Sequence, residues 1–184
     1  RGWFYSMLVL GVGLFGVSPY RNVIVNGLIL AEDGQKMSKR LKNYPDPVEV
    51  MEHYGADALR FYLLSSPVVR AEDLNFSEKG VAEVYRKNVV RLMNVRSFLE
   101  LYRPQGRTLP DYHESTVLLD QWIRARLDEL RTQVGEAMDA YELDRETKPI
   151  STFNDDLSTW YLRRSRERFK DGEELLLVSA TLTQ

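Results

Sequence analysis

The stretch NVIVNGLILAEDGQKMSKRLKNY, from Asn22 to Tyr44, decides how the fold is interpreted. Residues 22–31 are mostly β-branched or otherwise apolar, which predicts a strand covered on both faces. A turn through Gly34 follows, because glycine accepts a positive φ. The next loop presents Lys36 and Lys39 with a serine between them. Two mobile ammonium groups at this spacing suit a polyanion such as a row of phosphates, whereas an arbitrary lysine-rich loop is more often a solvated turn.

Helix signals flank this stretch on both sides. Upstream, residues 3–16 form an expected helix with an apolar face, ended by Gly16, and the run Met7–Val17 is interpreted as a buried, close-packed segment. Downstream, the run from Asp46 to Glu49 provides an N-cap acceptor, a proline at the first helical position and an acid in the first turn. That helix should end at Gly55, and a second should cover residues 56–64. The chain up to about Ser66 therefore has mixed α/β patterning.

From residue 77 onward the pattern is helical throughout. Apolar residues at steps of three and four predict one long amphipathic helix that breaks at residues 103–106. Another helix should begin near Ser115, and a last one should cover residues 153–170 with Pro149 near its start or kinking an earlier turn. Three antiparallel helices joined by short links predict part of a bundle. The expected fold is an α/β remnant over residues 1–66 followed by a helical domain over 67–184, predominantly helical overall.

Composition limits the function classes. The 184 residues include 25 Lys or Arg and 27 Asp or Glu, so a formal net charge of -2 provides no bulk attraction to nucleic acid, and any RNA contact must come from local clusters. No cysteine is present, which excludes disulfides and thiol chemistry within the chain. The apolar run Met7–Val17 is too short to span a bilayer and is interrupted by glycine, so no membrane association is expected. No metal-ligand cluster is visible, and a bound metal is not expected.

The densest cationic stretch lies near the end of the last predicted helix, from Arg163 to Lys170. A solvated helix end that is favoured by the helix dipole explains it, and so does phosphate contact along an RNA stem. Trp160 is expected in the core and Tyr161 at the core edge, in preference to the alternative that they are base-stacking platforms.

Several motifs resemble a known family. The segment from Lys36 to Arg40 resembles the KMSKS loop of class I aminoacyl-tRNA synthetases, with Arg40 in place of the final serine. Two neighbouring segments are similar to those of isoleucyl-tRNA synthetases: RGWF at 1–4 and WYLRRSR at 160–166. NGL at 26–28 and KNYPDP at 42–47 resemble the archaeal and eukaryotic-type branch of these enzymes, and GADALR at 55–60 is shared more widely by the class. The resemblance covers about residues 1–170.

The resemblance implies the end of a Rossmann-like catalytic domain that carries the lysine loop, followed by an anticodon-binding bundle. The implied reaction is the activation of isoleucine by ATP, with Mg²⁺ accompanying ATP as substrate, and transfer to tRNA(Ile) in a reducing cytoplasm. No resident metal or organic cofactor is implied for this segment. The implied site comprises a catalytic pair, Lys36 and Lys39; ATP contacts from Gly27, Leu28, Met37 and Ser38 beside that pair; an isoleucine-pocket wall, Trp3; and tRNA contacts from Arg163, Arg164 and Arg166.

The family's second ATP motif, His-Ile-Gly-His, and its editing domain are not found in these residues. The chain is therefore expected to be an internal fragment whose partner is the rest of a synthetase chain, and to be inactive alone. One alternative is a non-catalytic RNA-binding module in which the arginine stretch carries the function. Another is a valyl, leucyl or methionyl synthetase, against which RGWF at 1–4 and NYPDP at 43–47 argue.

Overall fold

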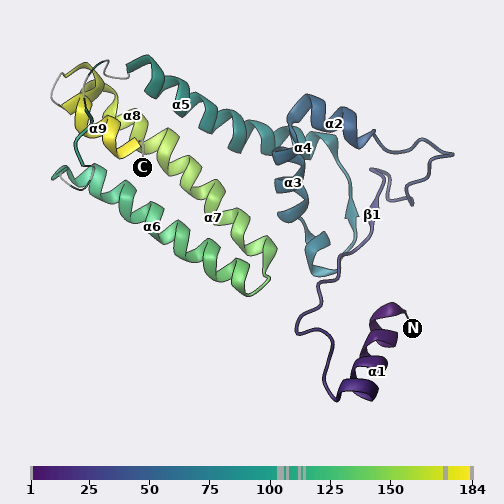
Figure 1. Cartoon of the computed structure of the whole chain (residues 1–184). Coiled ribbons are helices and arrows are strands. Elements are labelled where there is room, and N and C mark those ends of the chain that lie inside the picture. Colours follow the sequence, from purple (N-terminus) through teal and green to yellow (C-terminus); the bar gives the residue numbers. More distant parts are fainter. Residues whose placement is uncertain are drawn as a thin grey trace.

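The computed structural model describes residues 2–102, 106, 108–111, 113, 115–171 and 174–182. Over these residues the chain is predominantly helical, with one short sheet (Figure 1). The elements in order are α1 (Trp3–Phe15), β1 (Ile29–Leu30), α2 (Pro47–Tyr54), α3 (Ala56–Leu64), η1 (Pro67–Arg70), β2 (Leu74–Asn75), α4 (Glu78–Val84), η2 (Tyr85–Val90), α5 (Arg91–Tyr102), α6 (Leu118–Asp139), α7 (Leu143–Asp155), η4 (Asp156–Tyr161), α8 (Leu162–Ser165), η5 (Arg166–Lys170) and α9 (Glu174–Leu182).

Helix α1 forms where the sequence predicts it and lies apart from the other elements in Figure 1. Gly16 ends it in the left-handed conformation, with φ of 69°, and its N–H donates to the carbonyl of Val12 at 3.0 Å. The prediction that this segment is buried is wrong for these 184 residues. Its large apolar side chains are exposed, and Phe15 is 76% exposed. A helix that is apolar all round is typical of a core position, yet among the described residues only the segment after the helix packs on it, with Tyr20 against Phe4.

The predicted strand over residues 22–31 is much shorter in the structure. Only Ile29 and Leu30 form β1, and they pair in parallel with β2. The rest of the segment is extended, because a strand needs a neighbour to which it can donate its N–H groups and β2 offers one for two residues only. The apolar composition therefore correctly identified an extended segment but not its pairing or its burial.

Helices α2 and α3 follow the predicted boundaries. The Asp46 carboxylate accepts the N–H of Val48 at 2.8 Å, and Gly55, with φ of 82°, separates the two helices. Their core consists of Val50, Ala58 and a residue of α4, Val81, so the packing continues past residue 66. The division of the chain at residues 66 and 67 stays a prediction.

The long predicted helix is present as α4, η2 and α5, continuous from residue 78 to 102 with an i→i+5 turn at 85–90. Its predicted break falls on residues 103–106, of which only Gly106 is described; Arg1 of the first motif also lies outside the described residues. Helix α6 begins at Leu118, three residues after the expected start. Helices α5, α6 and α7 lie side by side as an elongated bundle (Figure 1), which confirms the expected architecture.

The last helix differs from the prediction. It begins at Leu143, ten residues early, and contains Pro149 in its interior. A proline inside a helix removes one backbone donor and disturbs the preceding turn, but α7 stays helical through Pro149 with α6 packed beside it. Beyond Asp155 the run continues through an i→i+5 segment, η4, to Lys170. The buried residues Ile123, Tyr161 and two others from η5 and α9 form the core of this part.

Candidate functional site

A tight turn returns the chain from β1 to the lysine loop. Gly34, with φ of 78°, donates its N–H to the carbonyl of Ala31 at 2.9 Å, and the N–H of Ala31 donates to Gln35 at 2.8 Å. An antiparallel bridge then joins Leu30 to Lys36. The turn predicted from glycine at this position is confirmed, and it anchors one end of the loop to the sheet.

Asn43 holds the backbone of the loop from its other side. Its side-chain oxygen accepts the N–H of Ser38 at 2.9 Å, and its side-chain amide donates to the carbonyl of Lys36 at 3.3 Å. The carbonyl of Ser38 accepts the N–H groups of Leu41 and Lys42, at 3.1 and 2.9 Å. The backbone of the loop is therefore held by its own contacts, without support from the lysine side chains.

Four exposed cations lie on this loop: Lys36, Lys39, Arg40 and Lys42. Within the described part of the chain none of them forms an ion pair. Several arginines of the bundle, in contrast, have carboxylate partners, as Arg126 has in Asp156 at 2.9 Å. A cluster of cations without internal partners on a fixed backbone is an arrangement suited to an external polyanion.

An apolar cavity of about 180 Å³ lies beneath the loop. Met37 lines it together with Tyr44, Phe76 and residues of α2 and α3. Met37 is half-buried, whereas Lys36 and its other cationic neighbours are exposed. The loop therefore places the side chain of Met37 inward and its cations outward, while its second apolar residue, Leu41, is exposed.

The other residues expected at the ATP and amino-acid sites lie on different elements. Gly27 donates its N–H to the carbonyl of Val68 at 2.8 Å, and Leu28 donates to the carboxylate of Asp73 at 2.9 Å. A Cβ at Gly27 would come within 1.9 Å of the Glu72 carbonyl oxygen, so only glycine fits there. These two residues directly precede β1, on the same strand segment that leads to the lysine loop.

Trp3 begins α1 and is 70% exposed, with its ring stacked on that of Phe4 at a centroid distance of 4.4 Å. In Figure 1 this helix lies away from the segment that carries the lysines. Its role as a wall of an isoleucine pocket stays a prediction.

The cationic stretch of the last helix divides into two groups. Arg168 and Lys170 have carboxylate partners, whereas Arg163, Arg164 and Arg166 are exposed and have none among the described residues. The second group is the one expected to contact tRNA, and that role stays a prediction.

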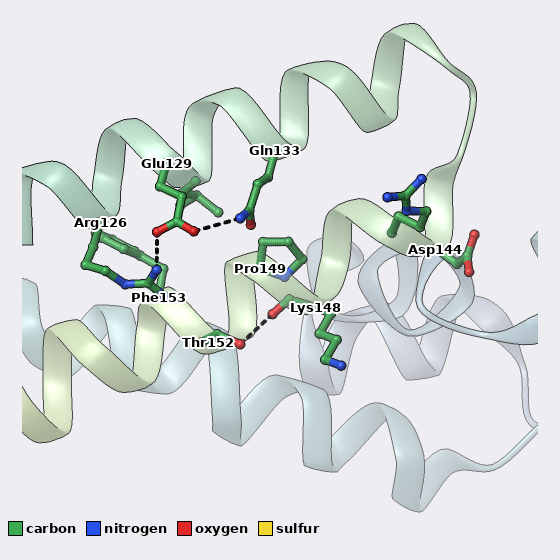
Figure 2. Close-up of a pocket in the computed structure, with 10 residues that line it drawn as sticks. Arg126, Glu129, Gln133, Asp144, Lys148, Pro149, Thr152 and Phe153 are labelled. Atoms are coloured by element: carbon green, nitrogen blue, oxygen red, sulfur yellow. Dashed lines mark hydrogen bonds and ion pairs between the residues drawn. The ribbon is translucent and has the colours of Figure 1, made fainter.

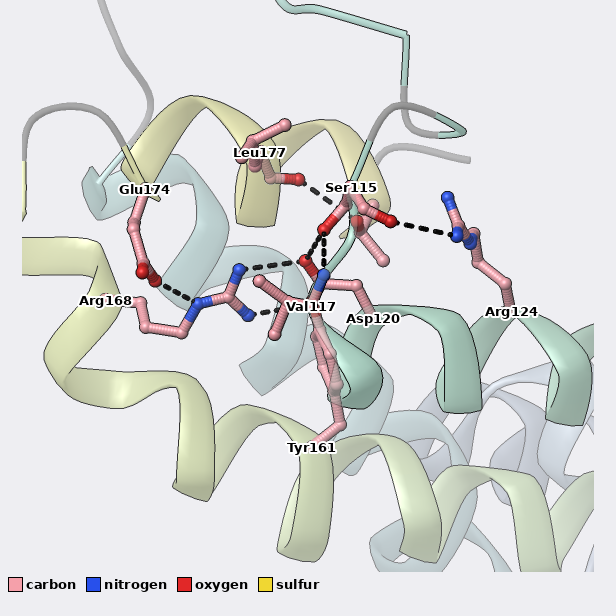
Figure 3. A network of polar contacts seen from close by, with 9 residues as sticks. Ser115, Val117, Asp120, Arg124, Tyr161, Arg168, Glu174 and Leu177 are labelled. Atoms are coloured by element: carbon pink, nitrogen blue, oxygen red, sulfur yellow. Dashed lines mark hydrogen bonds and ion pairs between the residues drawn. The ribbon is translucent and has the colours of Figure 1, made fainter.

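Figure 3 shows the buried network that holds Arg168. The carboxylate of Asp120 is 0% exposed and accepts hydrogen bonds from both terminal nitrogens of Arg168, at 2.7 and 2.8 Å. It also accepts the hydroxyls of Ser115 at 2.6 Å and Tyr161 at 2.8 Å, while Glu174 of α9 accepts the Nε–H of Arg168. Burial raises the pKa of Asp120, but these hydrogen bonds, chiefly from Arg168, outweigh it and hold the pKa below its usual value.

Sequence reasoning missed this network. Asp120 reads as an ordinary first-turn acid of α6, and nothing in the local pattern indicates a partner 48 residues away. The network joins α6 to the last helix and to α9, so its role is structural.

A groove of about 400 Å³ lies between α6 and α7, beside Pro149 (Figure 2). Its walls carry Arg126 and Glu129, which pair with each other, and Lys148, which has no ion pair among the described residues. Most charged side chains of its walls form ion pairs with other residues of the chain. This groove therefore lacks a cluster of unpaired cations like that on the lysine loop. Among the described residues no group of three or more metal-ligating side chains occurs, and no described helix is long and apolar enough to cross a membrane.

Comparison with known proteins supplies the family. The profile of tRNA synthetases class I (I, L, M and V) matches residues 1–75, and the anticodon-binding domain of tRNA ligases matches residues 120–184. The isoleucine–tRNA ligase of Protochlamydia amoebophila is 49% identical over 176 residues, and that of Bdellovibrio bacteriovorus is 48% identical over 175. The chain belongs to the class I tRNA synthetases. The region matched by the first profile includes the lysine loop, and the region matched by the second includes the arginine stretch. The chain is called the synthetase segment below.

The synthetase segment covers a small part of these relatives. The two matches include 95% and 94% of the chain but only 17% of each relative. A solved LeuRS–tRNA–LeuAMS ternary complex from Agrobacterium radiobacter matches 97% of the chain and 22% of that protein, with a TM-score of 0.69 at 20% identity. This likeness confirms the predicted fold. The resemblance to isoleucyl enzymes is confirmed by the relatives, while the archaeal and eukaryotic-type branch stays a prediction.

Proposed function

We propose that this chain is the part of an isoleucine–tRNA ligase that carries the lysine loop and the start of the tRNA-binding bundle. The observation that carries the proposal is the lysine loop itself: four exposed cations without internal partners, on a backbone held by the Asn43 side chain. Its place within a segment 49% identical to an isoleucine–tRNA ligase supports the choice of amino acid. The substrates are isoleucine, ATP with Mg²⁺, and tRNA(Ile).

The chemistry explains why lysines are needed here. The carboxylate of isoleucine attacks the α-phosphate of ATP in line, and pyrophosphate leaves with growing negative charge. Lys36 and Lys39 bind the departing phosphates and stabilise that charge most in the transition state. Ammonium groups on flexible stems suit this task because they can follow the charge as it moves.

The neighbouring residues complete the proposed substrate site. Gly27 and Leu28 approach the adenine through their backbone, Met37 and Ser38 shape the loop around ATP, and Trp3 forms one wall of the isoleucine pocket. The second ATP motif and the editing domain are supplied by the rest of the synthetase. In the bundle, Arg163, Arg164 and Arg166 contact tRNA phosphates, and the exposure of all three supports this.

The test uses the full-length synthetase that contains this segment and measures isoleucine-dependent ATP–pyrophosphate exchange. A charge-assisted hydrogen bond contributes about 1.5–3 kcal/mol, and ~1.4 kcal/mol corresponds to a factor of ten in rate. Lys39→Gln should therefore lower kcat by about tenfold to a hundredfold. The matched control is Lys79→Gln, an exposed lysine on α4, which should leave exchange unchanged. Equal rates in the two variants would refute the role of the loop.

A further inference from the structure

Trp160 is exposed on the helix that carries the arginine stretch. Its side chain is 48% exposed, although its neighbour Tyr161 is completely buried. The guanidinium of Arg164 lies over its ring at 3.9 Å from the centroid. An indole that is half in water beside a cationic group calls for a physical reason, because its burial would favour the fold.

The i→i+5 segment η4 explains why Trp160 faces outward. Continuing the α-helical spacing from Phe153 and Leu157 would place Trp160 on the core face, three residues after Leu157. An i→i+5 turn contains about one extra residue, so the side chains that follow are rotated by about 100°. Tyr161 takes the core position instead, where its hydroxyl donates to Asp120 at 2.8 Å. The prediction that Trp160 lies in the core is therefore wrong, and Tyr161, predicted at the core edge, lies within the core itself.

The charges around Trp160 favour an external anionic ligand. The nearby carboxylates already have cationic partners: Asp155 pairs with Arg91, and Glu167 pairs with Lys170 at 2.9 Å. Arg163, Arg164 and Arg166 then stay without carboxylate partners in the described part of the chain. The helix dipole favours cations at this end of the helix, and these three guanidinium groups are available to an external anion.

Together these features place an exposed aromatic ring directly beside a cation, with Arg163 and Arg166 close by along the chain. The planar guanidinium of Arg164 lies over the indole as a nucleobase would, and no carboxylate of a described residue fixes it there. An unpaired base can stack on the indole or on the guanidinium plane, while Arg163 and Arg166 reach the adjoining phosphates. We propose that Trp160 and Arg164 form a stacking platform for an unpaired base of the anticodon loop. This inference rests on the proposed function, in which the bundle binds tRNA.

The test measures binding of tRNA(Ile) to the full-length synthetase over a series of salt concentrations. Stacking of one base is worth a factor of about five to a hundred in affinity, so Trp160→Ala should raise Kd by that factor, whereas Trp160→Phe should retain most of the affinity. The salt dependence should stay the same in Trp160→Ala. In Arg163→Gln one phosphate contact is lost. The plot of the logarithm of the association constant against the logarithm of the salt concentration should therefore become shallower, its negative slope decreasing in magnitude by about 0.7–0.9.

The matched control is Tyr141→Asn, which removes another exposed aromatic side chain at the α6–α7 turn. Asparagine is chosen because residue 141 has φ of 60°, a conformation that asparagine tolerates. This variant should bind tRNA like the parent enzyme.

Anticodon stem–loops in which each loop nucleotide in turn is abasic identify the stacked base. At one position the abasic change should cost as much as Trp160→Ala, and the two changes together should cost no more than either alone. Should Trp160→Ala fail to fold, stem–loops carrying 2-aminopurine provide a second measurement on the unaltered enzyme, with fluorescence quenched at the same position.

Two negative outcomes are distinguishable. If Trp160→Ala binds tRNA normally while Arg163→Gln weakens binding, the stacking platform is refuted and the proposed function stands. A lower Tm in Trp160→Ala with unchanged binding refutes the platform in the same way, because the indole would then be covered by another part of the protein. If the parent enzyme does not bind tRNA(Ile), the proposed function itself fails.

Discussion

Replacing Arg168 by methionine tests whether the buried network holds the bundle together. Asp120 is completely buried, and Arg168 provides two of its four hydrogen bonds. Methionine keeps much of the side-chain volume but leaves a buried carboxylate with no cation beside it. Removing one partner of a buried ion pair costs about 3–5 kcal/mol, which corresponds to a fall in Tm of about 6–20 °C for a chain of this size.

The assay is urea and thermal unfolding of the chain at pH 7 and at lower pH. Because the folded pKa of Asp120 lies below its unfolded value of about 3.9, its ionised form stabilises the native protein above that pH, and this stability is lost as pH falls through the folded pKa. In Arg168→Met the hydrogen bonds that offset the effect of burial on Asp120 are lost. The pKa of Asp120 in the folded state should therefore rise. The stability difference between the two proteins should therefore narrow as pH falls from 7 towards 4.

Two comparisons make the result specific. Arg145→Met removes an exposed ion pair with Glu142 and should change the free energy of unfolding by no more than about 1 kcal/mol. The double variant Asp120→Asn with Arg168→Met removes both charges and should recover part of the loss. A loss in Arg168→Met below about 1 kcal/mol, or one that is the same at pH 7 and pH 4, would show that the network does not stabilise the bundle as its geometry implies.

Two further predictions concern the first part of the chain, and a third concerns the chain as a whole. Gly27→Ala should destabilise the fold by about 1–3 kcal/mol in urea unfolding, because its Cβ would collide with the Glu72 carbonyl, whereas Gly13→Ala, which meets nothing within 4 Å, should not. Asn43→Ala should slow isoleucine-dependent pyrophosphate exchange in the full-length enzyme while binding of tRNA is unchanged, since it frees the Ser38 backbone; equal exchange rates would exclude this positioning role. The 184 residues alone should show no such exchange, and exchange at the rate of the full-length enzyme would contradict the proposed division of the ATP site.

The parts of the fold that could be predicted depend on contacts between residues close in sequence. The Asp46 cap, the Gly55 helix end and the Gly34 turn each follow from the preference of one residue for one backbone conformation. The lysine loop likewise keeps its cations together because they are adjacent in the chain. These features need no knowledge of what packs against them.

The parts that failed depend on distant contacts. Residues 22–28 lack strand partners in the described chain, and their composition could not show that. Pro149 stays inside α7 because α6 packs along that helix, against its local preference. Asp120 meets Arg168 only in the folded bundle, so its charge pattern in the sequence is that of an ordinary helix start.

The arginine stretch shows how one buried contact determines what its exposed neighbours can do. Asp120 accepts two hydrogen bonds from the guanidinium of Arg168. This pair of bonds fixes both the position of the helix end and its rotation about the helix axis. Because Tyr161 is attached to the same carboxylate, both ends of the segment between them are held from inside. Arg163 and Arg164, which lie between these anchors, must then project to solvent. Arg168, which is held inside by Asp120, therefore orients the neighbouring arginines that are proposed to contact tRNA. The five cationic positions of this stretch have different roles and are not interchangeable.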